Sequence, residues 1–362
     1  MTKPELLSLT KSELETFFAA LGEPTYRAGQ AFPLLHRGIA PADMTCFSKS
    51  LREKMTEAAV WHLPTVAKKL VSQIDGTIKY LFRLADGNCV ESVVMKYKYG
   101  NTICISSQVG CRMGCRFCAS TIGGKVRDLT AGELLGQVIA AGKDSGERIG
   151  GIVLMGIGEP LDNYENVLKF LRLVNAPEGL HIGYRHISLS TCGIVPRIYD
   201  LQKEDLPITL SISLHAPDDQ TRGEIMPINR RYGVAELLAA CRSYFGATGR
   251  RISFEYTLIA GKNDSVEQAK KLARVLNAGL RSRTETMPIH VNLIPVNEVK
   301  ETGFRKTDRA AVRKFAAVLE ENGIRATLRR TLGADINASC GQLRRANDAG
   351  SNEHKTTVSD AY

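Results

Sequence analysis

The sequence runs Cys111-Arg-Met-Gly-Cys115-Arg-Phe-Cys118 about one third of the way along the chain, so three cysteines fall within eight residues. Three thiolates on one short loop suit a four-iron cluster, because they hold three irons and leave the fourth open to a small molecule. A structural zinc site with Cys104 as the fourth thiol is the alternative. The chain has nine cysteines, and an odd number without an export signal argues against a disulfide framework.

The residues on either side of this cysteine loop predict where it lies in the fold. The segment Thr102 to Ser107 alternates like a strand, and the loop follows it directly. Thr130 and Glu133 have the spacing of a capping box, which opens a helix through about Ala141. Because strand, loop and helix follow one another, we expect the loop at the carboxyl end of a parallel sheet, where α/β folds place their sites.

The rest of the chain alternates strand-like and helix-like segments. We predict strands at 151–155, 186–190, 208–213, 252–258, 289–294 and 324–329, and helices at 164–174, 234–245, 265–278 and 307–322. Repeated strand-then-helix units favour a parallel sheet with right-handed crossovers. The sequence therefore predicts an α/β fold, an open (partial) parallel β/α barrel of about six units.

The segments outside this barrel have a different character. The first 60 residues have the pattern of short helices, and residues 66–84 are strand-like. Asp86-Gly87 predicts a hairpin turn into the alternating segment 90–95. We predict three parts: a small, mainly helical N-terminal accessory domain at 1–85, the core at 86–345 and a disordered tail at 346–362.

The composition limits the classes of protein that remain. The chain has 362 residues and a formal net charge of +10, with the basic excess in residues 96–345. Such an excess favours a polyanionic partner. No uncharged apolar run reaches the length of a membrane span, and the first residues lack the apolar core of a signal peptide. We expect a soluble protein of the cytoplasm.

Several motifs carry a family resemblance. The cysteine loop resembles that of the radical SAM superfamily, in which three cysteines hold a [4Fe–4S] cluster and S-adenosylmethionine (SAM) chelates the fourth iron. The wider sequence resembles the RlmN/Cfr family of RNA adenine methyltransferases in Cys104-Ile-Ser-Ser-Gln-Val-Gly-Cys111, Met155-Gly-Ile-Gly-Glu-Pro160, Ser213-Leu-His-Ala216, Met226-Pro-Ile-Asn229 and Cys340-Gly-Gln-Leu343. The resemblance extends from about residue 4 to residue 345. It implies a radical SAM core, a cluster on Cys111, Cys115 and Cys118, and an N-terminal domain that helps to bind RNA.

The resemblance also implies residues that bind SAM. Gly158-Glu159 corresponds to the family pair that holds the amino-acid end of SAM. Further positions that correspond to SAM contacts are Ser190, Ser213, Leu214, His215 and Asn297. Considered without the family, a Gly-rich strand end is a common turn, although a carboxylate there can accept hydrogen bonds from an ammonium group. A lone histidine is more often structural than functional, but His215 directly follows a strand.

Three residues correspond to the family's catalytic groups. Adenine C2 is electrophilic and has no lone pair, so ordinary attack on a SAM methyl group cannot occur there. The family chemistry uses two SAM molecules: one methylates Cys340, and the other yields a radical that takes a hydrogen from that methyl group, whose carbon then adds to the base. Glu91 corresponds to the proton acceptor for the protein–RNA adduct, and Cys104 to the resolving thiol.

The same three residues have simpler interpretations when the family is set aside. Cys340 would be a surface thiol in a polar loop, and Glu91 would lie on the solvent face of a strand. Cys104 lies inside a strand pattern and would be a core thiol that shares a face with Ser106.

The resemblance implies an enzyme that makes 2-methyladenosine in 23S rRNA, at the peptidyl-transferase centre, and in tRNA, at the adenosine 3′ of the anticodon. It also implies a monomer and a one-electron reductant of the flavodoxin or ferredoxin type. Two alternatives stay open: a Cfr-type enzyme that methylates adenine C8 of 23S rRNA, and a zinc-stabilised RNA-binding protein without catalysis. The loop Cys118-Ala-Ser-Thr-Ile-Gly-Gly124 resembles the C2 type more closely.

One position near Cys340 departs from the family, and several arginines are candidate contacts to RNA. Asn337 stands where the family commonly has aspartate, which changes the charge of the loop but leaves the thiol in place. Candidate RNA contacts are Arg112, Arg116, Arg344 and Arg345.

Overall fold

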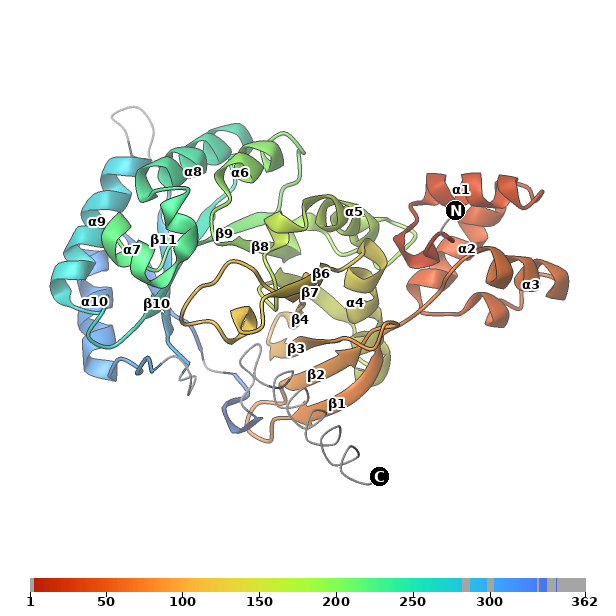
Figure 1. The fold of residues 1–362 in the computed structure, drawn as a ribbon, viewed down its shortest axis with the longest axis horizontal. Helices are drawn as coiled ribbons and strands as arrows, with labels where there is room; N and C mark the ends of the chain where they lie inside the picture. Colours follow the sequence, from red (N-terminus) through yellow and green to blue (C-terminus); the bar gives the residue numbers. More distant parts are fainter. Residues whose placement is uncertain (1–2, 282–286, 298–302, 331, 337–342, 344–362) are drawn as a thin grey trace, which may run out of the picture.

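The structure is a computed structural model that describes residues 3–281, 287–297, 303–330, 332–336 and 343. Its main feature is a ten-stranded sheet in the order β1-β2-β3-β4-β7-β8-β9-β10-β11-β12 (Figure 1). These strands are β1 (Thr65–Val71), β2 (Ile78–Arg83), β3 (Cys89–Tyr97), β4 (Gly100–Cys104), β7 (Ile149–Leu154), β8 (Ile187–Thr191), β9 (Thr209–Ser213), β10 (Ile252–Leu258), β11 (His290–Pro295) and β12 (Arg325–Leu328).

In this order, the strands β4, β7, β8, β9, β10, β11 and β12 pair in parallel with their neighbours. Strands β1, β2 and β3 add an antiparallel edge beside β4. Within the described residues, β1 and β12 stand at opposite edges of the sheet and do not pair. The sheet is therefore an open, partial barrel, and the predicted α/β fold is confirmed.

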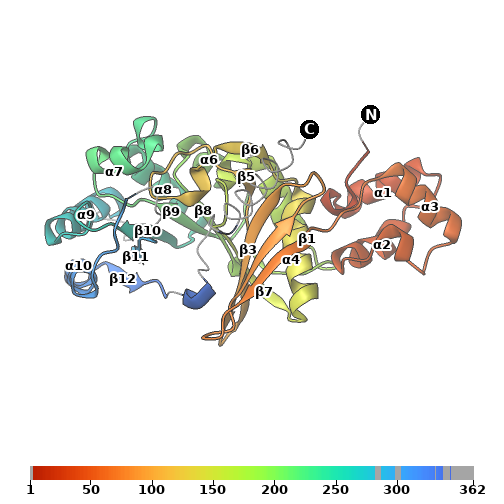
Figure 2. The same cartoon turned by 60° about the horizontal axis from the view of Figure 1, so that its bottom comes forward.

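Helices pack on the outer side of the curved sheet (Figure 2). After the cysteine loop they are α4 (Ala131–Ser145), α5 (Tyr164–Asn175), α6 (Val195–Leu201), α7 (Asp219–Ile225), α8 (Val234–Thr248), α9 (Val266–Leu280) and α10 (Arg309–Glu321). The predicted helices correspond to α4, α5, α8, α9 and α10. The sequence reasoning missed α6 and α7, because a seven-residue helix completes about two turns and shows little periodicity.

Strand β10 shows how the sheet divides its two faces. Its residues alternate between two buried sets: Ile252, Phe254, Tyr256 and Leu258, then Ser253, Glu255 and Thr257. The apolar set joins the main hydrophobic core, whereas Glu255 and Thr257 line a cavity inside the barrel. Burial on both faces is typical of a parallel strand. The polar set marks the barrel interior as the place where chemistry can occur.

The start of helix α4 confirms the predicted capping box. Thr130 N–H donates to a Glu133 carboxylate oxygen at 3.0 Å, and Glu133 N–H donates to Thr130 Oγ1 at 3.1 Å. Each of these two side chains thus accepts a hydrogen bond from the backbone N–H of the other residue, which has no partner within the helix. The helix ends at Ser145, beyond the predicted Ala141, and Gly146 follows in the left-handed conformation that commonly ends helices.

The first part of the chain is helical and packs against α4. Its helices are α1 (Lys11–Ala20), α2 (Arg27–His36) and α3 (Lys49–Ala58). Ser8 Oγ accepts a hydrogen bond from Gly132 N–H at 2.7 Å and donates to the Glu5 carboxylate at 2.5 Å. A Cβ at Gly132 would stand 2.7 Å from the Glu5 carboxyl carbon, so a larger residue there would displace the Glu5 carboxylate. The predicted boundary between residues 85 and 86 falls in the turn between β2 and β3, which pair with each other; as a division between domains it stays a prediction.

A second, two-stranded sheet closes the base of the cysteine loop. Strand β5 (Gln108–Gly110) pairs antiparallel with β6 (Lys125–Asp128). Gly110 has φ +78°, and a Cβ there would stand 2.0 Å from the carbonyl oxygen of Gly124. Only glycine allows the two ends of the loop to approach this closely.

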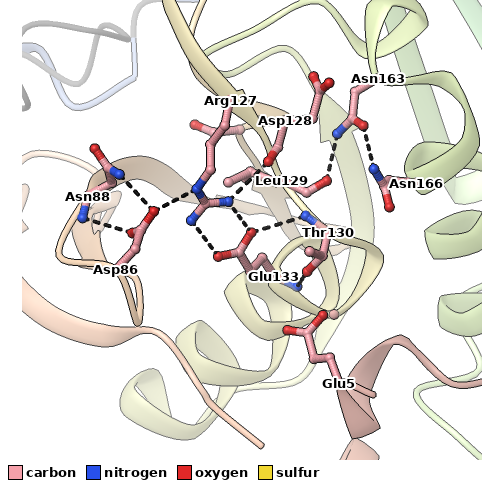
Figure 3. Close-up of polar contacts among 12 residues, drawn as sticks. Glu5, Asp86, Asn88, Arg127, Asp128, Leu129, Thr130, Glu133, Asn163 and Asn166 are labelled. Carbon is pink, nitrogen blue, oxygen red and sulfur yellow. Dashed lines mark hydrogen bonds and ion pairs between the residues drawn. The ribbon is translucent and has the colours of Figure 1, made fainter. Parts of the chain in front are cut away.

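Arg127 of β6 connects this small sheet to its neighbours. Its guanidinium donates to Asp86, in the β2–β3 turn, at 2.6 Å and to both Glu133 oxygens of α4 at 2.7 and 2.8 Å (Figure 3). The cysteine loop is thereby fastened both to the antiparallel edge of the barrel and to helix α4. Arg127 was not singled out from the sequence, because its partners lie in separate elements.

Candidate active site

The three loop cysteines line a cavity of about 220 Å³ at the carboxyl ends of the parallel strands. The same cavity is lined by residues from the ends of five strands: Leu154, Met155, Ser190, Thr191, Ser213, Thr257 and Ile294. This is the location that the strand–loop–helix pattern predicts. A fourth cysteine, Cys192, also lines the cavity. Cys104, the fourth ligand in the zinc alternative, packs instead with Val93 and Met95.

Asp162 holds both ends of the cysteine loop. Its carboxylate accepts hydrogen bonds from Lys125 at 3.0 Å and Gln108 at 2.9 Å, and it pairs with Arg112. Burial would raise the pKa of Asp162, but these donors outweigh it and hold the pKa below its ordinary value. Arg112, a candidate contact to RNA, therefore has a carboxylate partner inside the protein.

The loop thiols have the chemistry of iron–sulfur ligands. Burial raises the pKa of Cys111 to about 12 and also raises that of Cys115. Because a thiolate is the ligand form, metal binding must displace these protons. No three His, Cys, Asp or Glu side chains in the described part of the chain already stand at the spacing of a single metal ion. Three thiols around one cavity fit a [4Fe–4S] cluster by donor type.

Glu159 adds a carboxylate to the lining of this cavity. One oxygen accepts from Cys192 N–H at 2.7 Å and the other from Leu161 N–H at 3.0 Å. Burial raises the pKa of Glu159, and these donors oppose the rise. The side chains of Thr191 and Cys192 also hydrogen-bond to this carboxylate. That this carboxylate binds SAM stays a prediction.

Gly156 and Gly158 let the loop that carries Glu159 pack against the backbone after β4. A Cβ at Gly156 would stand 2.5 Å from the carbonyl oxygen of Ile105, and one at Gly158 would stand 2.7 Å from Gln108 N. Gly158 also has φ +105°. Glu159 N–H then donates to Gln108 Oε1 at 2.9 Å. The glycines accommodate neighbouring backbone and so bring Glu159 to the lining of the cavity.

His215 lies at the end of β9 with its ring against Phe117 of the cysteine loop. It has φ +58°, and its Nδ1 accepts from Thr257 N–H at 2.9 Å. Burial lowers the pKa of His215 to about 3, and the nearby positive charge of Arg222 adds to this effect. The imidazole is therefore neutral at physiological pH.

The other predicted SAM contacts divide into two groups. Ser190 and Ser213 line the cavity together with Gly158, Glu159 and His215. The structure does not bring Leu214 or Asn297 to it: Leu214 is fully buried in the main core, and Asn297 is exposed just beyond β11.

The sequence reasoning missed Arg222 of α7, whose side chain is fully buried beside this cavity. Its guanidinium donates to three backbone carbonyls and one amide oxygen, on Leu214, Cys192, Ser213 and Asn229, at 2.7 to 3.1 Å. The hydrogen bonds join the ends of β8 and β9 to the Met226–Asn229 segment. No carboxylate within the described residues pairs with this cation.

Glu91 and Cys104 share the inner face of the barrel, next to the site cavity. Glu91 is 1% exposed, and its carboxylate lies 3.2 Å from Lys79 Nζ, so the expectation of a solvent-facing strand residue is wrong. Cys104 is buried with Val93, Met95 and Met155, and Met155 also lines the cavity. The expectation that the thiol is buried is confirmed.

Residues near the C-terminus cover this inner face. Leu332 packs with the Cys104 group, and Leu343 packs with Leu81 and Cys89 of β2 and β3. Cys340 lies between them in the sequence but outside the described residues, as do Asn337, Arg344, Arg345 and the predicted tail.

Comparisons with known proteins identify the family of this chain. The radical SAM superfamily model matches residues 105–273, and the model of the ribosomal RNA large subunit methyltransferase N-terminal domain matches residues 4–60. A structure of a radical SAM methyltransferase from Sphaerobacter thermophilus is 42% identical, with a TM-score of 0.87 over 94% of this chain and 98% of its own. The fold and the cysteine cavity thus define a radical SAM enzyme.

Two curated relatives narrow the assignment. The probable dual-specificity RNA methyltransferase RlmN of Clostridium acetobutylicum is 54% identical over 94% of this chain and 96% of its own length. The protein of the same name in Alkaliphilus metalliredigens is 49% identical over 95% and 96%. The chain belongs to the RlmN family of radical SAM RNA methyltransferases. Among the described residues, no helix is both long and apolar enough to cross a membrane.

Proposed function

We propose that the protein methylates adenine C2, making 2-methyladenosine in 23S rRNA at the peptidyl-transferase centre and in tRNA at the adenosine 3′ of the anticodon. The observation that carries this proposal is the single cavity in which the three loop thiols and the buried Glu159 carboxylate lie together. The names of the relatives, which are dual-specificity RNA methyltransferases, support an RNA substrate.

Binding of SAM is the first task of the cavity. Cys111, Cys115 and Cys118 would hold a [4Fe–4S] cluster, which supplies the electron that cleaves SAM reductively. Glu159 lines this cavity and presents a carboxylate to the SAM ammonium group. Ser190 and Ser213 offer hydroxyl groups at neighbouring strand ends. His215 contributes a neutral ring to the lining, so it adds no positive charge to the cavity that would hold SAM.

Transfer of the methyl group to the base is the second task. We assign Cys340 as the methyl carrier, Glu91 as the acceptor of the proton lost from adenine C2 and Cys104 as the thiol that resolves the covalent protein–RNA intermediate. This assignment is supported by the common inner face of Glu91 and Cys104, and by Leu332 and Leu343, which pack on that face from either side of Cys340 in the sequence. Each turnover uses two SAM molecules, one for the carrier methyl and one for the radical.

The remaining parts of the proposal concern partners and location. The electron comes from a flavodoxin- or ferredoxin-like protein, and the enzyme acts as a monomer in the cytoplasm. The basic composition, with a net charge of +10, supports a polyanionic substrate.

Nucleoside mass spectrometry tests the proposal. Cluster-reconstituted protein is incubated without oxygen with SAM, a reductant and unmodified rRNA or tRNA, and the RNA is then digested. We expect 2-methyladenosine from both substrates and none from Cys340→Ala. The matched control is Cys46→Ala, which removes an exposed thiol far from the site in sequence.

Other outcomes would replace the proposal. An 8-methyladenosine product would assign the chain to the Cfr-type alternative. A colourless, oxygen-stable protein that contains zinc and makes no methyladenosine would support the non-catalytic RNA-binding alternative. A brown, iron-loaded protein that forms no methylated adenine would refute the assigned substrate.

A further inference from the structure

A second and much larger cavity, of about 1260 Å³, opens at the amino ends of the same parallel strands. It is lined by the starts of β4, β7, β8 and β9 and by the turns that precede β8 and β10. We call it the amino-end groove. Nothing in the proposed chemistry uses its residues, which include Asn101, Gly150, Ser188 and Thr209.

Arginines dominate the charge of this groove. Arg148, Arg185, Arg251 and Arg329 all line it and are all exposed. Across the described part of the chain, none of the four has an ion pair with a carboxylate, although eighteen such pairs occur among other residues. A concave surface with one sign of unpaired charge concentrates ligands of the opposite sign.

The two carboxylates that line the groove are already engaged. Glu147 accepts hydrogen bonds from Lys96 at 2.5 Å and Asn101 at 2.7 Å. Glu255 is buried and accepts from Asn292 at 2.7 Å. The positive charge of the arginines is therefore available to a ligand.

A pair of stacked tyrosines forms part of the rim. Tyr97 and Tyr99, where β3 turns into β4, have ring centroids 5.0 Å apart and planes within 5° of parallel. Tyr99 is 82% exposed. Exposed aromatic rings beside a positive groove are the features with which proteins bind single-stranded nucleic acid, because bases stack on the rings while cations contact the backbone.

The groove also leads to the active site. Met155, Glu255 and Arg329 line both the amino-end groove and the cavity of the three cysteines. A nucleotide that enters the groove can thus extend a base toward the cysteine cavity. A double helix cannot follow this path, because its bases are stacked and paired inside.

We propose that the amino-end groove binds the single-stranded RNA that flanks the target adenosine. In this arrangement Arg148, Arg185 and Arg251 contact successive phosphates, and a neighbouring base stacks on Tyr99. The inference rests on the proposed function, because it gives the route by which the RNA substrate reaches that site.

The charge of the groove is tested by salt titration of RNA binding. The probe is a fluorescently labelled RNA hairpin with an adenosine in its loop, bound to cluster-loaded protein and measured by anisotropy. In the triple variant Arg148→Gln, Arg185→Gln, Arg251→Gln, the slope of log affinity against log salt becomes shallower by about 2, which corresponds to about 0.7 for each lost contact. Between about 50 and 200 mM salt, the wild type then loses about 16-fold more affinity than the variant.

A matched control removes the same charge from another face. Arg274, Arg309 and Arg313 are exposed on α9 and α10 and do not line the groove. Replacing all three by Gln leaves the salt slope unchanged if the groove holds the phosphates. Equal slopes for the two triple variants would overturn the proposal, because the effect would then come from net charge alone.

Tyr99 gives an independent test. Tyr99→Ala weakens hairpin binding roughly 10-fold without changing the salt slope, and Tyr99→Trp restores it, because stacking needs only an aromatic face. A fully paired RNA duplex of the same length loses no affinity in Tyr99→Ala. Hairpin binding that is insensitive to Tyr99 would overturn the stacking contact.

Two further results separate this inference from the function on which it rests. If the wild type makes methyladenosine while the groove variants bind and methylate RNA normally, the groove proposal fails and the function stands. If the groove variants bind RNA normally but lose reduction by an acidic flavodoxin-type protein, the groove is a docking site for the reductant and the RNA proposal is overturned. If the wild type binds the hairpin through the groove and never methylates it, the proposed function fails while the groove stands as an RNA site.

Discussion

At the carboxyl ends of the parallel strands, a cavity of about 220 Å³ is lined by thiols, small hydroxyl groups and a buried carboxylate. At the amino ends, a groove of about 1260 Å³ is lined by exposed arginines and histidines and by the stacked pair Tyr97 and Tyr99. Two charged groups near the first cavity are bound by other groups of the chain: Asp162 by three donors and Arg222 by four acceptors. The arginines of the groove make no ion pair with a carboxylate in the described chain, so a ligand can pair with them.

The two regions show how one residue type serves two purposes. Arg222 is fully buried and joins strand ends through backbone carbonyls, so its loss should disturb structure. Arg148, Arg185 and Arg251 are exposed and make no ion pair with a carboxylate in the described chain, so their loss should disturb binding. The three predictions below test this contrast.

The largest effect is expected from Arg222→Met. The substitution leaves the carbonyls of Leu214, Ser213 and Cys192 buried without their donor, which costs about 3 kcal/mol of the free energy of unfolding. Urea unfolding of the cluster-free protein, followed by circular dichroism, measures the loss. Arg222→Lys keeps the positive charge but offers fewer hydrogen-bond donors, so its free energy of unfolding should fall between those of the wild type and Arg222→Met.

The groove provides the matched comparison for this prediction. The triple variant Arg148→Gln, Arg185→Gln, Arg251→Gln should unfold within about 0.5 kcal/mol of the wild type, because exposed side chains without specific partners contribute little. If Arg222→Met were as stable as the triple variant, the distinction between a structural and a ligand-binding arginine would fail.

A smaller effect is expected from Asp162→Asn, which weakens the contacts to Arg112, Gln108 and Lys125. We expect the free energy of unfolding to fall by about 1–2 kcal/mol at pH 7. These donors hold the pKa of Asp162 low in the folded chain. The contribution of the Asp162 carboxylate to the free energy of unfolding is therefore complete above the ordinary aspartate pKa of about 3.9. It disappears as the pH falls through the lower pKa that Asp162 has in the folded chain.

Unfolding curves at pH 7 and pH 3 check this prediction. The difference in stability between wild type and Asp162→Asn should narrow as the pH falls. Asp43→Asn is the control, because Asp43 is exposed and has no ion pair among the described residues. A difference that stays constant from pH 7 to pH 3 would show that the carboxylate charge does not hold the cysteine loop.

The features that could be predicted from the sequence are local. The three cysteines, the Gly158-Glu159 pair and the capping box at Thr130 each lie within one short segment, and strand periodicity extends over a few residues. Parallel topology then follows from the alternation of strands and helices, because each crossover returns the chain to the same end of the sheet. This reasoning was sufficient to place the cysteine cavity.

The features that were missed depend on residues far apart in the chain. Glu91 was expected to face solvent, because period-two alternation shows which residues share a face of the strand but not what covers that face. In the structure Lys79 is a buried partner of Glu91, and Leu343 helps to cover the inner face of the barrel. Arg148, Arg185, Arg251 and Arg329 occupy separate turns or strand ends, and only the register of the sheet brings them to one groove. No local pattern marks either arrangement.

The smallest expected effect concerns His290, which senses the charge of the groove. Burial lowers the pKa of His290, and the nearby Arg251 and Arg325 lower it further. Its ring is held by Ser253 at 3.0 Å and Thr327 at 2.9 Å, so its position should survive a neighbouring substitution. Because a cation disfavours a second positive charge, Arg251→Gln should raise the pKa of His290 toward its ordinary value.

Histidine NMR titration of the two proteins measures this shift at low salt, and added salt should reduce it, because ions screen exposed charges. Arg274→Gln removes an equal charge from α9 and should leave the titration of His290 unchanged. A shift of equal size in both variants would mean that His290 responds to the net charge of the molecule. A shift confined to Arg251→Gln would establish that His290 responds to the local charge of Arg251 at the amino-end groove and not to the net charge of the molecule.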